Sequence, residues 1–377
     1  MRRRAIMQPV DSRPRSRRLR WWMTAASVAG SAFGLVASLY SAELRRVLEA
    51  SGRGFVTTGL PIAVTAVVAS VSGVLIYELL FRRGRVADVT AGEIAIRADA
   101  LEGIVSDEDA VVGRSLRYLE TRRRSADLVV FLPGLGLDAN DFRPYLSESK
   151  FHCVALTLYG FNPAERDDEH YQPISLQAHA QLVAYALRRL RTAYPRKRIT
   201  VVGFSFGADM ILFLLEFAPE VLRDLQLRKA VLLDPNINRS TTTFSARIAR
   251  VDTDSSLRDL VAILRSAKDR SELRYLCEYL AKITSKNFAQ VWRYAQEVSS
   301  RFNHDSHDPF LDAVGQLVGV TEGVHVILSF NHETIFNSVA HAAAARGLDL
   351  NDLECSRTDH FELLSPGFLK DRLEGVL

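Results

Sequence analysis

A serine flanked by glycines lies in the middle of the chain, in the motif Gly203-Phe204-Ser205-Phe206-Gly207. The apolar run ITVV precedes the motif and ADMILFLLEF follows it, so we predict that a strand enters and a helix leaves. In this context the serine sits on a sharp turn with its hydroxyl exposed, and glycines avoid Cβ clashes with the neighbouring strand and helix. The pattern predicts Ser205 as the nucleophile of an acyl transfer, rather than as an unreactive turn residue.

A serine hydroxyl needs a general base, and His360 is the histidine best placed to provide one. It lies in Thr358-Asp359-His360-Phe361, after the last predicted strand and before a closing helix. This is the place of the base when a serine, an acid and a histidine follow one another along the chain.

Two carboxylates compete to orient the histidine and to stabilise its cation. Glu333 follows one predicted strand, in Asn331-His332-Glu333, and Asp234 ends another, in Leu233-Asp234-Pro235. Both belong at the carboxyl edge of the predicted sheet. We favour Glu333 and keep Asp234 as the alternative.

Acyl transfer also requires donors for the developing oxyanion. The N–H of Phe206 is one candidate because it directly follows the nucleophile. The second is the N–H of Leu135, in the Pro133-Gly134-Leu135-Gly136 loop after a predicted strand, where Gly134 allows the backbone to approach a substrate closely.

Short apolar runs that alternate with longer amphipathic stretches predict the elements that position these residues. Runs of this kind suit strands buried on both faces of a mostly parallel sheet, with ligands at the carboxyl ends of the strands. Helices are predicted between them, at Ser175–Tyr194 and Phe206–Phe217. The predicted strands are Ser115–Thr121, Leu128–Leu132, Cys153–Leu158, Arg198–Phe204, Lys229–Asp234, Val324–Phe330 and Leu350–Cys355.

One stretch, at about residues 240–320, contains no convincing strand and predicts a helical cap above the strand ends. Its predicted helices are Ser255–Ser266, Ser271–Ser285, Phe288–Phe302 and Pro309–Val318.

Taken together, FLPGLGLDANDF, GFSFGA and a late DHF resemble the α/β-hydrolase family over roughly residues 110–377. The resemblance implies an eight-stranded sheet with helices on both faces, a cap between strands six and seven, and a serine–acid–histidine triad. The sequence departs from the family pattern in three places. Pro133-Gly134 replaces the usual His-Gly, Asp359 precedes the histidine where Gly is common, and the usual acid motif after strand seven reads Ser-Phe-Asn-His-Glu.

Two long apolar segments precede this region. Trp21–Tyr40 has no charged residue, and Phe55–Phe81 has Glu78 as its single charge. Each is long enough to span the hydrocarbon layer. Small residues recur every four positions from Ala26 to Ser38, which favours close packing of two helices in lipid. We predict a hairpin of two transmembrane helices within residues 21–85, in preference to a cleaved signal peptide or a pair of buried soluble helices.

Positive charge at the N-terminus sets the predicted orientation. Residues 1–20 hold eight Arg and one Asp, whereas the whole chain has a net charge of +4. The remainder is therefore slightly acidic and offers no basic surface for nucleic acid. The basic tail at residues 1–20 and Arg82–Arg85 place both ends of the hairpin in the cytoplasm. The hydrolase-like domain at residues 86–377 would then be cytoplasmic as well.

The sequence thus predicts a membrane-anchored serine hydrolase that cleaves a small-molecule or lipid-like ester or thioester. We expect no cofactor, no metal and no nucleic-acid partner. An acyltransferase on the same site and a non-catalytic binding protein with this fold remain alternatives.

Overall fold

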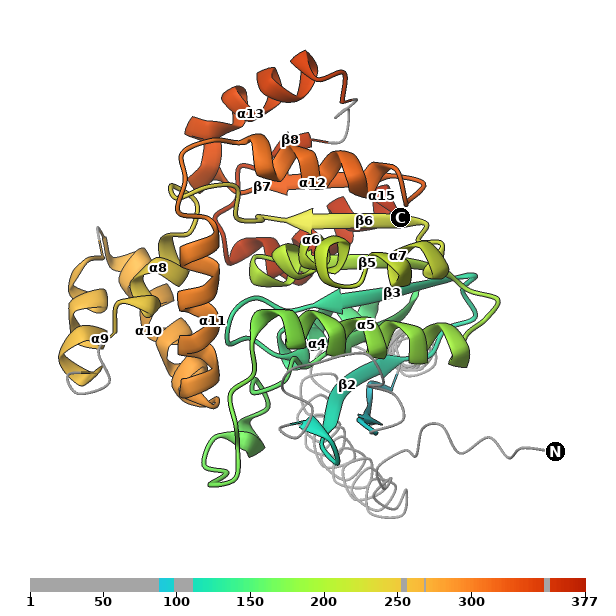
Figure 1. The fold of residues 1–377 in the computed structure, drawn as a ribbon, viewed down its shortest axis with the longest axis horizontal. Coiled ribbons are helices and arrows are strands. Elements are labelled where there is room, and N and C mark those ends of the chain that lie inside the picture. The colour runs from blue at the N-terminus through green and yellow to red at the C-terminus, as the bar shows by residue number, and fades with distance from the viewer. Residues whose placement is uncertain (1–87, 98–110, 252–255, 268, 349–352) are drawn as a thin grey trace, which may run out of the picture. The chain divides into compact units, whose positions relative to one another are not determined.

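The computed structural model describes residues 88–97, 111–251, 256–267, 269–348 and 353–377 (Figure 1). Their strands form one eight-stranded sheet in the order β1-β2-β4-β3-β5-β6-β7-β8. Neighbours from β4 to β8 pair in parallel, and β2 runs against both of its neighbours. The predicted α/β class with a mostly parallel sheet is confirmed. In chain order the strands are β1 (Thr90–Ala95), β2 (Ser115–Thr121), β3 (Asp127–Leu132), β4 (His152–Leu156), β5 (Arg198–Phe204), β6 (Lys229–Leu233), β7 (Val324–Leu328) and β8 (Leu353–Cys355).

The central strands are buried on both faces. Every residue of β3 and β4 is buried, as is every residue of β5 after Arg198. Such strands carry continuous apolar residues, which is why the sequence reveals them. The sequence patterns do not predict β1, because TAGEIA is half exposed and becomes a strand only by pairing with β2.

Three strands end earlier than predicted: β4, which ends at Leu156 rather than Leu158, and two others whose ends bear on the site. β6 ends at Leu233, so that Asp234 is the first residue beyond it. β7 ends at Leu328 rather than Phe330, and a 3-10 turn, Phe330–His332, follows it.

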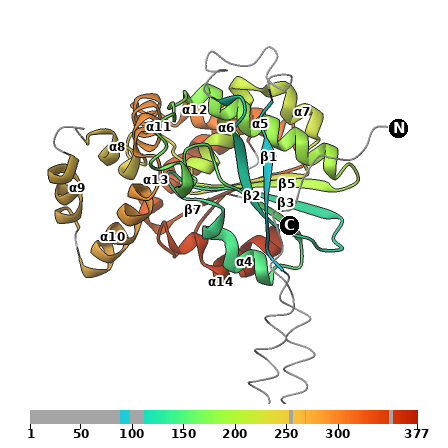
Figure 2. The ribbon, with the colours of Figure 1, turned by 90° about the horizontal axis from the view of Figure 1, so that it is seen from below.

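Helices cover both faces of the sheet (Figure 2). One face carries α5 (Leu176–Ala193), α6 (Phe206–Phe217), α7 (Pro219–Leu225) and α12 (Asp308–Val318), and the other carries α4 (Arg143–Glu148) and α14 (Pro366–Phe368). Helix α13 (Glu333–Ala345) packs beside β8, and α15 (Glu374–Val376) closes the chain. Helix α5 begins where predicted because the Ser175 side chain accepts a hydrogen bond from the N–H of Ala178 at 3.2 Å.

Four helices between β6 and β7 gather beyond one end of the sheet, beside the head of the β6 arrow (Figure 1). They are α8 (Thr243–Ala249), α9 (Ser256–Arg265), α10 (Arg270–Thr284) and α11 (Phe288–Arg301), and we call them the cap. No described residue between 240 and 320 forms a strand. Helix α12 was expected in the same insertion, but it packs against α6 and β7 and so belongs to the layer on the sheet.

Residues 1–87 lie outside the described residues, and the predicted basic tail and transmembrane hairpin lie there with them. Among the described helices, none is long and apolar enough to cross a membrane.

A cluster of rings joins the cap to the layer behind the serine motif. His179 of α5 stacks on Tyr294 of α11, with 4.6 Å between ring centroids, and its ring centroid lies 6.0 Å from that of Phe206. His179 is fully buried, and neither of its ring nitrogens has a hydrogen-bond partner among the described residues. Burial lowers the pKa of His179 to about 3, so the folded protein holds this side chain neutral.

This buried histidine makes stability depend on pH in a predictable direction. An unfolded histidine takes up a proton below about pH 6.5, whereas folded His179 does not. The free energy of unfolding should therefore fall as the pH drops below 6.5, by about 2 kcal/mol at pH 5 from this residue alone. Urea unfolding at pH 8 and pH 5 gives the loss of unfolding free energy on acidification. This loss should be about 2 kcal/mol smaller in His179→Phe than in the wild type. The exposed His341 supplies the control: His341→Gln should keep the wild-type pH dependence. An equal loss of unfolding free energy in the wild type and in His179→Phe would show that His179 is not the source of this pH dependence.

Candidate active site

Ser205 occupies the turn between β5 and α6. Its backbone has φ 52°, a left-handed conformation that is unusual for a residue with a side chain. Its N–H donates a hydrogen bond to the carbonyl of Leu233, at the end of β6, at 2.7 Å. Ser205 is partly exposed although the residues on either side of it are buried. The turn therefore presents the serine hydroxyl outward, as the motif predicts.

The two glycines of the motif allow this turn to pack closely. A Cβ on Gly203 would lie 2.3 Å from the carbonyl oxygen of Gly207, and a Cβ on Gly207 would lie 2.1 Å from that of Leu132. Both neighbours are backbone atoms, which cannot rotate away as a side chain can. The predicted reason for the glycines is confirmed: a larger residue at either position would push the turn away from β3 or from its own helix.

Asp234 occupies the corresponding turn at the end of β6. It also has φ 52°, and its N–H donates to the carbonyl of Ile327 in β7 at 2.7 Å. Its buried carboxylate accepts four hydrogen bonds. The donors are Ser329 N–H at 2.7 Å, Ser329 Oγ at 2.7 Å, His332 Nδ1 at 2.7 Å and His360 Nδ1 at 2.5 Å.

Two opposing effects set the charge of Asp234. Burial disfavours the carboxylate, but the hydrogen bonds from His332 and His360 outweigh it and hold the pKa of Asp234 well below its ordinary value. Asp234 is therefore ionised at neutral pH. An ionised carboxylate only accepts hydrogen bonds, so Nδ1 of each imidazole carries the proton that it donates.

His360 lies in the turn after β8, with its ring among aromatic side chains. Ring centroids lie 4.7 Å from Phe204, 5.6 Å from Phe244 of the cap and 5.0 Å from Phe361. Because Nδ1 donates to Asp234, Nε2 is the nitrogen available to take a proton. This is the tautomer that a general base next to a serine requires.

A cavity of about 550 Å³ brings these side chains together with the cap. The strand ends contribute Ser205, Asp234, His332, Glu333 and His360, and the cap contributes Phe244, Arg247, Glu272, Tyr275 and Leu276.

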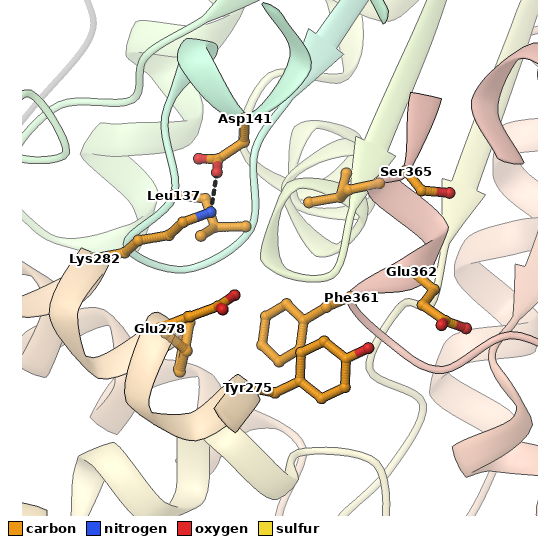
Figure 3. Close-up of a pocket in the computed structure, with 10 residues that line it drawn as sticks. Leu137, Asp141, Tyr275, Glu278, Lys282, Phe361, Glu362 and Ser365 are labelled. Carbon is orange, nitrogen blue, oxygen red and sulfur yellow. Dashed lines mark hydrogen bonds and ion pairs between the residues drawn. The ribbon is translucent and has the colours of Figure 1, made fainter. Parts of the chain in front are cut away.

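A second cavity of about 300 Å³ lies beside the first and shares Tyr275 and Phe361 with it (Figure 3). These two rings stack, with centroids 6.1 Å apart. Lys282 of α10 reaches across to form an ion pair with Asp141. The two cavities thus meet at one aromatic pair, between the cap and the segment that follows His360.

Comparison with known proteins identifies the family to which this chain belongs. The profile of the alpha/beta hydrolase family matches residues 129–368. The chain belongs to the alpha/beta hydrolase family. No curated protein is detectably similar to this hydrolase-family chain.

Solved structures of several enzymes share the fold at low sequence identity. 1H-3-hydroxy-4-oxoquinoline 2,4-dioxygenase is 13% identical, with a TM-score of 0.51 over 71% of this chain and 98% of its own. A membrane phospholipase A described as a bacterial virulence factor is 15% identical, with a TM-score of 0.47 over 84% and 98%. An N-acyl homoserine lactonase is 12% identical, with a TM-score of 0.43 over 70% and 92%. Likeness at this level shows the alpha/beta hydrolase fold alone.

The sequence leaves two carboxylates as candidates to orient His360, and the structure places them differently. It brings Asp234 to His360 and leaves Glu333, which we favoured from the sequence, exposed at the first position of α13. β7 ends early, and the turn at Phe330–His332 that follows places His332, rather than Glu333, against Asp234. Glu333 still lines the cavity.

The two expected oxyanion donors belong to the serine turn and to the loop after β3, the strand that pairs with β5. Phe206 is the first residue of α6, where backbone N–H groups have no acceptor within the helix. Leu135 is buried in the loop after β3, and its carbonyl accepts a hydrogen bond from the hydroxyl of Tyr279 at 3.1 Å. The cap thereby contacts the backbone of the loop that was predicted to face the substrate.

Sequence reasoning missed a second buried carboxylate. Asp209, on α6, accepts hydrogen bonds from Asn236 N–H at 2.8 Å and from Asn236 Nδ2 at 2.5 Å. Burial raises the pKa of Asp209 to about 7, against the opposing effect of these hydrogen bonds. The pair ties the helix that follows Ser205 to the loop that follows Asp234. An acid at the start of the apolar run ADMILFLLEF, directly after the serine motif, is the signal that could have revealed it.

Sequence reasoning did not single out Ser329 or His332 either. Both lie in the segment that was searched for an acid, and both donate hydrogen bonds to the acid of the neighbouring strand. Among the described residues, no cluster of His, Cys, Asp and Glu is arranged to hold a metal ion.

Proposed function

We propose that this protein is a serine hydrolase that cleaves an ester or thioester through an acyl-enzyme on Ser205. The observation that carries the proposal is the hydrogen bond between ionised Asp234 and His360 at the edge of the cavity that Ser205 also lines. The fold alone does not select this reaction, since a dioxygenase has the same fold. The residues at the strand ends support the hydrolase proposal.

In the proposed reaction, Nε2 of His360 accepts the proton of the Ser205 hydroxyl as Oγ attacks the substrate carbonyl. The N–H groups of Phe206 and Leu135 stabilise the oxyanion of the tetrahedral intermediate. The protonated histidine then gives its proton to the departing alcohol or thiol, leaving the acyl group on Ser205. Water, activated by the same histidine, releases the acid and restores the serine. Transfer of the acyl group to an acceptor other than water would make the protein an acyltransferase.

We infer that Asp234, rather than Glu333, is the acid of this triad. A triad acid must hold the base by a hydrogen bond and carry a negative charge when the imidazole becomes a cation. Asp234 meets both conditions. The exposed Glu333 has no hydrogen bond to His360 among the described residues.

The membrane anchor remains a proposal based on the sequence. Two apolar segments within residues 21–85, flanked by Arg-rich stretches, support a transmembrane hairpin with the catalytic domain in the cytoplasm. Such an anchor would place the cavity near lipid-like esters that partition into the membrane.

The nucleophile is tested by an active-site probe. A fluorophosphonate should label the wild-type protein, since an activated serine displaces fluoride from phosphorus. Ser205→Ala should not be labelled, whereas Ser266→Ala, at an exposed cap position, should be labelled like wild type. Absence of labelling in the folded wild-type protein would favour a non-catalytic binding protein.

The acid is tested by two isosteric substitutions. Asp234→Asn should lower kcat on p-nitrophenyl butyrate by about 10³- to 10⁴-fold, because the amide no longer stabilises the imidazolium. Glu333→Gln should stay within about twofold of wild type. Thermal unfolding should accompany both assays to show that each variant is folded. The reverse pattern would assign the triad to Glu333.

The anchor is tested by fractionation. The full-length chain should remain with the membrane after washing in high salt and alkaline carbonate, because a transmembrane hairpin is not held by charge alone. Deletion of residues 1–85 should release a soluble protein that the fluorophosphonate still labels. Recovery of the full chain in the soluble fraction without detergent would show that there is no hairpin.

A further inference from the structure

Asp234 is bonded to two imidazoles, although a serine–histidine–acid triad needs one. His360 Nδ1 lies 2.5 Å from Oδ2 of the carboxylate, and His332 Nδ1 lies 2.7 Å from Oδ1. Ser329 supplies one further donor to each oxygen. Each oxygen thus has two donors, and rotation of the carboxylate would break several of these hydrogen bonds at once.

Ser329 and His332 act as one unit because a single turn holds them. The N–H of His332 donates to the carbonyl of Ser329 at 2.9 Å, and the turn directly follows β7. β7 itself pairs with β6, the strand that ends directly before Asp234. The turn is therefore held beside the carboxylate by the sheet. It places a backbone N–H, a hydroxyl and an imidazole N–H on the same acid.

The surroundings of the two imidazoles distinguish their roles. His360 packs against Phe204, the residue before Ser205, at 4.7 Å between ring centroids. Among the described residues, His332 has no ring contact of this kind, and its hydrogen bond is to the oxygen that His360 does not use. His360 thus packs against the serine turn through Phe204, whereas the side-chain hydrogen bond of His332 is to Asp234.

We propose that His332 is a positioning residue of the hydrolase, which holds the Asp234 carboxylate so that Oδ2 faces His360. This inference rests on the proposed function, since it concerns the same triad. His332 exchanges no proton with the substrate in this role. Its imidazole N–H keeps the buried carboxylate oriented through each cycle in which His360 gains and loses its charge.

Three substitutions at this position separate a hydrogen-bond role from a packing role. Asn places its Nδ2 close to the position of the imidazole Nδ1 and can donate to Asp234. Gln, which is longer, places its amide nearer to Nε2, and Phe has no donor at all. His332→Phe and His332→Gln should lower kcat on p-nitrophenyl butyrate by about 10- to 100-fold, as expected for loss of a hydrogen bond to a charged group. KM should stay within about twofold of wild type, because the lost interaction is not with the substrate.

His332→Asn in the full-length protein should recover kcat to within about threefold of wild type. The matched control is His341→Gln, at an exposed position on the helix that begins at Glu333, which should leave kcat and KM unchanged. Fluorophosphonate labelling rates should follow the same order as kcat.

The possible results are distinct. Equal kcat in His332→Asn, His332→Gln and wild type would overturn the positioning role while leaving the hydrolase proposal intact. Loss of activity in all three His332 variants as complete as in His360→Phe would also overturn it, since His332 would then be acting as the base. If wild type neither hydrolyses the ester nor reacts with the probe, the proposed function fails, and this inference fails with it.

Discussion

The ionised carboxylate of Asp234, buried at the edge of the sheet, is the constraint around which the candidate site is arranged. A buried charge is costly unless it is paired and hydrogen-bonded. Here, Ser329, His332 and His360 provide the compensating donors from the segments after β7 and β8. Three consecutive strands must therefore end side by side, which a parallel sheet achieves because the carboxyl ends of its strands meet at one edge.

The same edge holds two residues in left-handed conformations, Ser205 and Asp234. Such conformations cost free energy and persist when the surrounding structure imposes them. In both cases the N–H of the residue bonds to a carbonyl of the next strand, so the ladder of the sheet continues one step into the turn. Asp209 and Asn236 add a connection between the two turns. The sheet and this buried pair hold Ser205 and Asp234 in fixed relation.

Local patterns predicted most of the fold and the turn that holds Ser205. Continuous apolar runs revealed β3 and β5 because these strands are buried on both faces, and the serine motif revealed its turn because only glycine fits there. β1 was not predicted, because its pairing with β2, rather than its own composition, makes it a strand. The choice between Asp234 and Glu333 depended on where β7 ends to within two residues. Boundaries of that precision are the least reliable part of sequence reasoning.

The contact between Phe244 of the cap and His360 gives the cap a second effect beyond shaping the cavity. In the proposed reaction, the charge on His360 would develop among aromatic rings and beside Asp234. Attraction between opposite charges is stronger in such a medium of low dielectric constant. Displacement of the cap would admit water and weaken that attraction. A substrate that holds the cap in place would thereby set the electrostatic environment in which its own carbonyl is attacked.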